Sequence, residues 1–367
     1  MADDVLPRDT IATVENSVRS ILRHQEENGA IVASPDFEQY HFCWLRDGSF
    51  CAYALDVAGQ YEASARYHSW VVKAVSGIAS LIDDVIATHE RGELLDPAFM
   101  PPARFALDGS TVIDDWPNFQ IDGYGTWLWS LGQHFALTGV ASVPEEFLES
   151  VTRVARYLSA FVLSPCYDVW EENGEDVHTS TLACVYGGLV AAGRLLDNTH
   201  YEVVAESIRT RLRGAAARGG YFIKSSASEE VDGSLLWLST PFRVVELKDR
   251  EFARTVALIE EQLKFEGGVR RYGADVYFGS GSWPVLTGSL GWYYVASGDL
   301  GRAIQYRDWI ATHFDTEGRL GEQFGGERRD PQHYQEWVAR WGPPARDLTW
   351  SHAMYVILSQ AIEEAGH

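Results

Sequence analysis

The strongest constraint on the fold of this 367-residue chain is a succession of helical patterns separated by short breaks. In the first pattern, Val14, Val18, Ile21 and Leu22 recur at spacings of three and four, and Gly29 follows as a stop signal. Similar patterns continue to the end of the chain. They predict helices over residues 10–28, 47–58, 61–90, 123–138, 145–163, 178–195, 199–215, 231–238, 249–264, 284–296, 300–313 and 348–364.

The even spacing of these patterns predicts an all-α fold. Each helix with its loop takes up about 31 residues, a length that suits a closed toroid of helices. Strand-like runs are few and short, with one extended piece expected over residues 221–224, which argues against an α/β barrel. Because no Ser/Gly linker or shift in composition marks a boundary, we expect residues 1–367 to form a single domain.

Charge and cysteine usage narrow the cellular context. A net charge of −22 disfavours nucleic acid and anionic membranes as partners, because both repel such a surface. The chain has no apolar run long enough to span a bilayer, and its acidic start is unlike a secretory signal. Cys43, Cys51, Cys166 and Cys184 show no CxxC spacing. We therefore expect reduced core thiols in a cytoplasmic protein.

Aromatic residues make up 13% of the chain, including 13 tryptophans. Such rings can stack on the flat faces of sugars in a pocket, or they can simply fill a large helical core. Several of them fall in the irregular stretches 91–121, 266–283 and 315–347, which are long enough to suggest a functional role. In a toroid, loops at one end can converge on a central pocket.

Two aromatic segments each carry a charged residue just before or at the start of a helix. In YHFCWLRDG, residues 40–48, Arg46 and Asp47 could grip the hydroxyls of a polar ligand, although Asp47 taken alone is better explained as a helix cap. In DDWPNFQIDG, residues 114–123, Trp116 is a candidate for sugar stacking, and Asp122 could again be a cap.

A third segment, DVWEENG at residues 168–174, contains adjacent carboxyl groups behind an indole. Burial of Glu171 or Glu172 beside Trp170 would favour the protonated form and allow it to act as a general acid near neutral pH. The alternative is a pair of surface glutamates in a loop, which is the commoner situation for two adjacent glutamates.

The remaining segments lie in the second half of the chain. GVRRYGADVYFGSGSWP, residues 268–284, places Arg271 and Trp283 in one loop, where they could close a pocket wall or form a solvated surface. GRLGEQFGG, residues 318–326, holds Glu322 between glycines, and DLTWSHA, residues 347–353, opens the last helix.

Together these segments suggest glycoside hydrolysis. That reaction needs two carboxyl groups, one on each side of the scissile bond. Glu171 and Glu322 come from distant loops, which allows the wide separation that an inverting enzyme needs.

Taken in order, the WLRDG, WEE, RRY…W, EQF and DLTWSHA segments resemble glycoside hydrolase family 15, the glucoamylase family. The resemblance runs from about residue 40 to residue 355. It implies an (α/α)6 barrel that cleaves α-glucosidic bonds from the non-reducing end with inversion. It also implies that Glu171 is the general acid and Glu322 the general base.

The resemblance assigns further residues to the pocket. Arg46 and Asp47 would hold the glucosyl unit in the innermost subsite, and Glu172 would reach the next sugar. Tyr40 matches a family tyrosine near the catalytic water, where it could assist the base. The pocket wall would be lined by Trp116, Trp170, Arg271 and Trp283.

Two departures from the family pattern suggest a substrate. Many prokaryotic members carry an N-terminal β-sandwich domain, and secreted fungal members have a signal and often a starch-binding module. Here the barrel pattern begins near residue 1. We therefore expect a compact, single-domain member without the β-sandwich that acts on short α-glucosides such as isomaltose, with no metal and no cofactor.

Other functions remain open from sequence. Family 15 also contains trehalases and enzymes for maltose and α-1,4-oligosaccharides, which would share the same acid and base. A sugar epimerase or isomerase on the same toroid would need histidines around its pocket, and His41, His68, His134 and His178 show no cluster in the sequence. A non-catalytic sugar-binding protein is disfavoured because both carboxylates are present.

Overall fold

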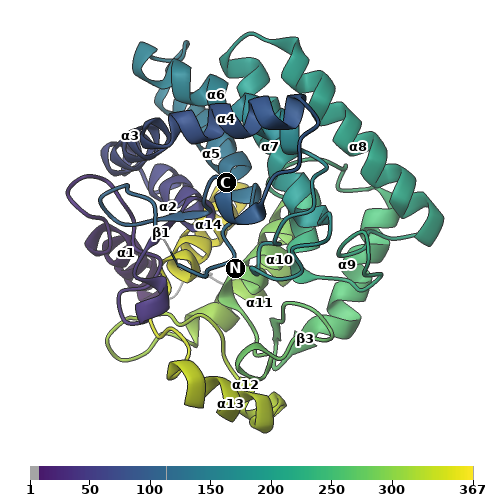
Figure 1. Cartoon of the computed structure of the whole chain (residues 1–367). Coiled ribbons are helices and arrows are strands. Elements are labelled where there is room, and N and C mark those ends of the chain that lie inside the picture. The colour runs from purple at the N-terminus through teal and green to yellow at the C-terminus, as the bar shows by residue number, and fades with distance from the viewer. Residues whose placement is uncertain (1–7, 113, 367) are drawn as a thin grey trace.

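The computed structural model describes the backbone of residues 8–112 and 114–366, with side chains from residue 14 onward. Most of the N-terminal segment that we expect not to be a secretory signal therefore lies outside the described residues. Most of the described chain is helical, and the helices form two concentric rings (Figure 1).

The inner ring has six elements, each in contact with the next, and the last returns to the first. Five are α-helices, and the sixth position is taken by a short 3-10 helix, η3. In ring order they are α2 (Leu45–Val57), α5 (Asp122–Thr138), α7 (Thr179–Leu195), η3 (Gly233–Leu238), α10 (Pro284–Ser297) and α14 (Thr349–Gly366).

The outer ring also has six helices, and each packs on one or two inner elements. They are α1 (Arg8–Arg23), α3 (Tyr61–Gly77), α6 (Glu145–Phe161), α8 (Thr199–Gly219), α9 (Arg250–Leu263) and α11 (Leu300–Ala311). Helices α6 and α9 bury one stripe of side chains and expose the other, whereas α2 and α10 are buried on nearly all sides. The (α/α)6 barrel expected from the family resemblance is confirmed.

Aromatic rings fill the axis of the barrel. Phe50 stacks on Trp350 with ring centroids 5.5 Å apart, and Trp237 lies 5.7 Å from Trp350. Glycines allow the inner helices to approach closely: a Cβ atom at Gly125 on α5 would lie 2.5 Å from the carbonyl oxygen of Cys184 on α7. Part of the aromatic excess therefore serves the core.

Strands are minor in the described residues. One sheet pairs β1 (Cys43–Trp44) with β2 (Arg104–Phe105) in antiparallel register, and the other pairs β3 (Lys264–Phe265) with β4 (Gly268–Val269). The extended piece expected over residues 221–224 is not a strand; the nearest pairing is an isolated bridge between His178 and Ser225.

The pattern over residues 61–90, expected to be one helix, is two. Helix α3 ends at Gly77, Ile78 leaves the helical region with φ −112° and ψ 18°, and α4 (Ala79–Glu90) continues in a new direction. Glycine at the end of α3 is a poor helix former and explains why the chain turns there.

The stretch 315–347, expected to be a loop, contains two further helices, α12 (Gly326–Arg329) and α13 (Pro331–Trp341). The start of α13 has a clear local cause. Pro331 occupies its first turn, and the Asp330 side chain accepts a hydrogen bond from the backbone N–H of His333 at 3.2 Å. This helix borders the pocket described below.

Within the described residues, no helix is both long enough and apolar enough to cross a membrane. The four cysteines are buried and unpaired, as expected.

Candidate active site

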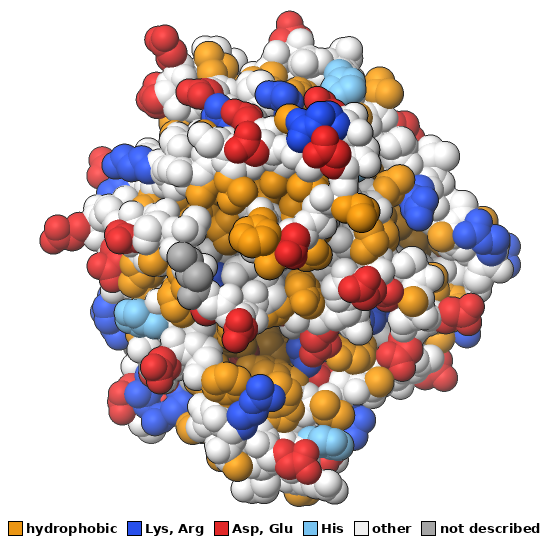
Figure 2. Space-filling model, viewed as in Figure 1, with side chains coloured by type: hydrophobic (Ala, Val, Ile, Leu, Met, Phe, Trp, Pro, Cys, Tyr) orange, Lys and Arg blue, Asp and Glu red, His pale blue; other side chains and the backbone are white. Residues whose placement is uncertain are grey.

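The loops that precede the five inner α-helices meet at one end of the barrel and border a cavity of about 790 Å³. In Figure 2 this cavity is a hollow lined largely by hydrophobic side chains, above the α12–α13 segment of Figure 1. All ten residues assigned to the site from sequence lie on its wall: Tyr40, Arg46, Asp47, Trp116, Trp170, Glu171, Glu172, Arg271, Trp283 and Glu322.

The bottom of the cavity is closed. Trp350, at the start of α14, lines the cavity and stacks on Phe50, which is fully buried in the barrel axis. The Arg46 guanidinium lies over the Trp350 ring, 5.3 Å from its centroid. Because packed rings fill the space below, a ligand reaches this cavity from one end only.

Arg46 is the charged centre of the inner cavity. Its Nη1 lies 3.1 Å from Oδ2 of Asp122, and its Nε lies 3.3 Å from Oδ2 of Asp47. Its Nη2 lies 3.5 Å from Oε1 of Glu171. Burial opposes the charge of Arg46, but the neighbouring carboxylates outweigh it and raise its pKa.

Asp47 and Asp122 do not cap their helices through their side chains. The N-cap residues of α2 and α5 are Trp44 and Ile121, neither of which makes a side-chain cap bond. The preferred interpretation of Asp47 alone, as a cap, is therefore wrong. Burial raises the pKa of Asp47 to about 6, and the adjacent Arg46 opposes this effect.

Glu171 occupies a strained turn. Its φ of 66° lies in the left-handed region that residues other than glycine rarely adopt. The Asp168 carboxylate holds this turn, because its Oδ1 accepts hydrogen bonds from the backbone N–H groups of Trp170 and Glu172, each at 2.9 Å. The strained backbone directs the Glu171 side chain to the cavity wall beside Arg46.

A buried lysine supports the same turn from behind. Lys224 Nζ lies 3.3 Å from Oδ2 of Asp168 and 3.1 Å from Oδ2 of Asp232. Asp232 also accepts a hydrogen bond of 2.9 Å from Nε1 of Trp170. Lys224 therefore neutralises two buried carboxylates that fix the backbone of Glu171 and the indole beside it.

The protonation of Glu171 is set by its surroundings. Burial raises its pKa to about 7, while the positive charge of Arg46 opposes this effect. The group can therefore carry a proton near neutral pH, which is what a general acid requires.

Glu322 is almost completely buried, with 1% of its surface exposed. Its backbone N–H donates to the carbonyl of Ala345 at 2.9 Å, and its Oε1 accepts a hydrogen bond of 2.9 Å from the Tyr40 hydroxyl. Burial raises the pKa of Glu322 to about 8, against the effect of this hydrogen bond. Among the described residues its Oε2 has no hydrogen-bond partner.

Tyr40 links Glu322 to a second phenol. Its hydroxyl oxygen lies 2.8 Å from that of Tyr277, so Tyr277 can donate to Tyr40 while Tyr40 donates to Glu322. Burial raises the pKa of both phenols, which keeps them protonated as donors. Tyr277 was not among the site residues expected from sequence.

Glu172 also lies on the cavity wall, where two neighbouring side chains hold its carboxylate. Its Oε1 lies 3.1 Å from Nη2 of Arg271, and its Oε2 accepts a hydrogen bond from Tyr272. Arg271 also pairs with Asp275 and lies 5.7 Å from the ring centroid of Trp283. The adjacent Glu171 and Glu172 therefore have different environments, one beside Arg46 and the other beside Arg271.

The mouth of the cavity is aromatic. Trp116 is partly exposed and packs under the Arg104 guanidinium, 4.2 Å from the ring centroid, and Arg104 pairs with Asp114. Helix α13 contributes Trp337 and Trp341 on the other side of the mouth. The sequence signal that could have predicted this helix is the spacing of its aromatic residues, because Tyr334, Trp337 and Trp341 lie three, four and seven residues apart.

Histidines do not form part of this cavity: none lines it in the described chain. The expectation that the histidines are scattered is nevertheless wrong for one pair. His68 and His134, far apart in sequence, have ring centroids 5.2 Å apart in the core.

Comparison with known proteins agrees with this geometry. Residues 10–324 match the family model for glycosyl hydrolases family 15. The chain is 39% identical over 349 residues to an isomaltose glucohydrolase from Kribbella flavida, covering 93% of this chain and 90% of that protein.

Solved structures give the same result. A glycosidase variant in complex with glucose superposes with a TM-score of 0.92 at 38% identity, over 97% of both chains. A bacterial glucoamylase complexed with acarbose shares the fold at 18% identity, with a TM-score of 0.71 over 96% of this chain and 56% of that one. The chain is a glycoside hydrolase, and it belongs to glycosyl hydrolase family 15.

Proposed function

We propose that this chain is an inverting exo-α-glucosidase that releases β-glucose from the non-reducing end of isomaltose and other short α-1,6-linked glucosides. One observation carries the proposal: two carboxyl groups, the partly buried Glu171 and the buried Glu322, lie on the wall of one cavity that is closed at its bottom. Two carboxyl groups that face one sugar unit are the requirement of glycoside hydrolysis.

Glu171 is proposed as the general acid. It transfers its proton to the glycosidic oxygen while the bond from that oxygen to the anomeric carbon breaks. A hydrogen bond from protonated Glu171 to the glycosidic oxygen favours the protonated form, as burial already does. Arg46 and the indole of Trp170 line the cavity beside this carboxyl group, with Arg46 Nη2 3.5 Å from Oε1 of Glu171.

Glu322 is proposed as the general base. A water molecule beside its carboxylate attacks the anomeric carbon from the face opposite the leaving oxygen, and Glu322 takes the proton of that water. The reaction therefore moves one proton from Glu171 to Glu322 and inverts the anomeric centre. The Tyr40 hydrogen bond at 2.9 Å favours the ionised state of Glu322 that this step requires.

The closed bottom supports action at a chain end. Arg46 and Asp47 lie next to the packed floor formed by Trp350, so a terminal glucosyl unit would fit there with its hydroxyls against charged groups. The rest of the substrate would leave through the mouth between Trp116 and α13.

The choice of isomaltose is supported by the 39% identity to a protein of that activity over most of both chains. The test is a comparison of kcat/KM for isomaltose, maltose, maltoheptaose and trehalose with one preparation. We expect isomaltose to be the best substrate. A kcat/KM a hundredfold higher on the α-1,4-glucans, or measurable only on trehalose, would reject the proposed linkage.

The proposal also includes the cellular compartment and the partners of the enzyme. It acts on a sugar substrate, and we propose a single catalytic unit in a reducing compartment such as the cytoplasm, without nucleic-acid or membrane partners. The four unpaired, buried cysteines and the net charge of −22 support this setting.

A further inference from the structure

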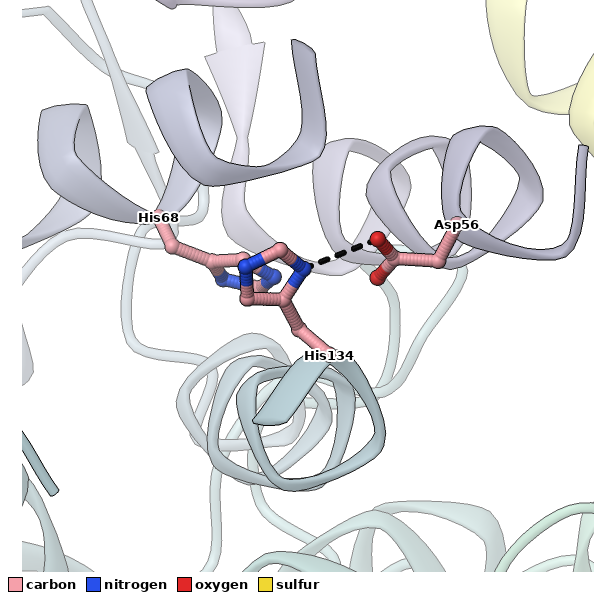
Figure 3. Close-up of side chains that lie close together, drawn as sticks. All are labelled: Asp56, His68 and His134. Carbon is pink, nitrogen blue, oxygen red and sulfur yellow. Dashed lines mark hydrogen bonds and ion pairs between the residues drawn. The ribbon is translucent and has the colours of Figure 1, made fainter. Parts of the chain in front are cut away.

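A cluster of buried polar side chains lies at the end of the barrel away from the catalytic cavity. It consists of Asp56 near the end of α2, His134 near the end of α5, and His68 on the outer helix α3 (Figure 3). Asp56 is nine residues beyond Asp47 on the same helix, a separation of about 14 Å along its axis. This cluster is therefore distinct from the catalytic site.

The three side chains point toward one another. Each offers one donor atom, and these atoms all lie within 4.8 Å of one another. Nδ1 of His134 lies 2.8 Å from Oδ1 of Asp56, whose other oxygen accepts a hydrogen bond of 2.9 Å from the Ser64 hydroxyl. Asp56 therefore ties together α2, α3 and α5.

His68 is the residue that this arrangement leaves unexplained. It is fully buried, and neither of its ring nitrogens has a hydrogen-bond partner among the described residues. Its ring lies beside that of His134, with ring centroids 5.2 Å apart. A buried imidazole without a partner costs stability, which a ligand at its nitrogen would relieve.

We propose that Asp56, His68 and His134 bind one divalent transition-metal ion, with Zn²⁺ as the best match, in a structural role. Two imidazoles and a carboxylate are donors that Zn²⁺ accepts, whereas Ca²⁺ and Mg²⁺ prefer oxygen donors alone. Tetrahedral zinc with bonds of about 2.0–2.2 Å has ligand atoms about 3.4 Å apart. The three donors, which lie within 4.8 Å of one another, would have to move closer by side-chain rotation to reach that separation.

The surroundings favour a cation. Asp56 and His134 lie near the C-terminal ends of their helices, where the helix dipole is negative. The bound ion would fasten outer helix α3 to inner helices α2 and α5.

The test uses the full chain, freed of metal with a chelator and then titrated with zinc chloride alone. We expect one Zn²⁺ per chain by calorimetry, and a rise in Tm of about 3 °C at a hundredfold excess over Kd. At the same zinc concentration, His68→Gln should bind Zn²⁺ at least about tenfold more weakly and show about half or less of the zinc-dependent rise in Tm. The matched control, His24→Gln, alters a buried histidine outside the cluster. It should keep the wild-type affinity for Zn²⁺ and the full zinc-dependent rise in Tm.

A readout on the unaltered chain keeps the proposal testable if His68→Gln does not fold. Co²⁺ added to the metal-free protein should produce the visible absorption bands of a tetrahedral site, and one equivalent of Zn²⁺ should remove them. Absence of those bands, no uptake of Zn²⁺, or an equal zinc-dependent rise in Tm for wild type and His68→Gln would overturn the proposal.

Discussion

The Tyr40 hydroxyl lies 2.9 Å from Oε1 of Glu322 and 2.8 Å from the hydroxyl of Tyr277. The three groups form a chain of hydrogen bonds that ends on a carboxylate with 1% of its surface exposed. Because a hydrogen bond to an ionised carboxylate stabilises that ion, Tyr40 opposes the effect of burial on Glu322. We propose on this basis that Tyr40 supports Glu322 as the base.

We expect Tyr40→Phe to lower kcat by about 10- to 100-fold with little change in KM. Loss of the hydrogen bond raises the pKa of Glu322 further, so the base is ionised only at higher pH. The pH optimum of kcat/KM, which lies midway between the two apparent pKa values of the pair, should therefore move to higher pH. An unchanged profile and kcat would assign Tyr40 to packing alone.

Tyr277→Phe provides a graded comparison for that experiment. It removes the donor to Tyr40 and leaves the contact between Tyr40 and Glu322 in place. We expect a shift of the pH optimum in the same direction as for Tyr40→Phe, but smaller. A larger effect from Tyr277→Phe than from Tyr40→Phe would contradict the proposed order of the hydrogen bonds.

The roles of the two carboxyl groups can be separated by the leaving group. Glu171→Gln should reduce kcat on isomaltose by more than about 1000-fold, because an amide cannot donate the required proton. Fluoride departs without that proton, so this variant should retain much of the wild-type rate on α-glucosyl fluoride.

Glu322→Gln is the matched variant. It should be inactive on both substrates, because attack by water needs the base whatever the leaving group. Equal losses on α-glucosyl fluoride for the two variants would reject the assignment of acid and base.

The pH profile follows from the raised pKa values of both carboxyl groups. Burial raises the pKa of Glu171 to about 7 and that of Glu322 to about 8, and each charge disfavours the other. Both carboxyl groups are protonated at low pH and both are ionised at high pH, and neither state combines a protonated Glu171 with an ionised Glu322.

We therefore expect a bell-shaped dependence of kcat/KM around neutral pH, which belongs to the pair rather than to either residue. Initial rates on isomaltose over a series of buffers provide the measurement. Activity that stays maximal well below pH 5 would contradict the burial of these groups.

Lys224 supports the strained turn at Glu171, and its removal tests that role. Lys224→Met would leave Asp168 and Asp232 as buried carboxylates without their cation. We expect a loss of about 3 kcal/mol or more in the free energy of unfolding, measured with denaturant. In the fraction that folds, kcat should fall more than KM rises, because Glu171 loses its fixed position.

Lys248→Met, at an exposed lysine, is the control and should change neither property. A Lys224→Met protein with wild-type kcat would show that the lysine serves stability alone.

The sequence predicted the barrel because the helical spacing is regular, and the ten residues proposed for the site line one cavity because the motif segments precede inner helices. Loops before Leu45, Asp122, Thr179, Pro284 and Thr349 meet at one end of the barrel once those helices share a ring. Segments that are distant in the chain are therefore neighbours in the cavity.

Other features depend on contacts that spacing alone does not encode. The capping interpretation of Asp47 ignored the possibility that Arg46 would be buried beside it. Helix α13 was hidden by the glycines and prolines on either side of it, although Asp330 and Pro331 form a normal helix start. His68 and His134 meet only because α3 and α5 pack side by side.

The most direct test of the central claim is proton NMR of the anomeric signals during the first minutes of isomaltose hydrolysis. Inversion by Glu171 and Glu322 predicts that the β-anomer of glucose appears first from the cleaved unit and that the α-anomer grows later by mutarotation. Early appearance of α-glucose would mean retention and would contradict the mechanism in which water attacks from the face opposite the leaving group.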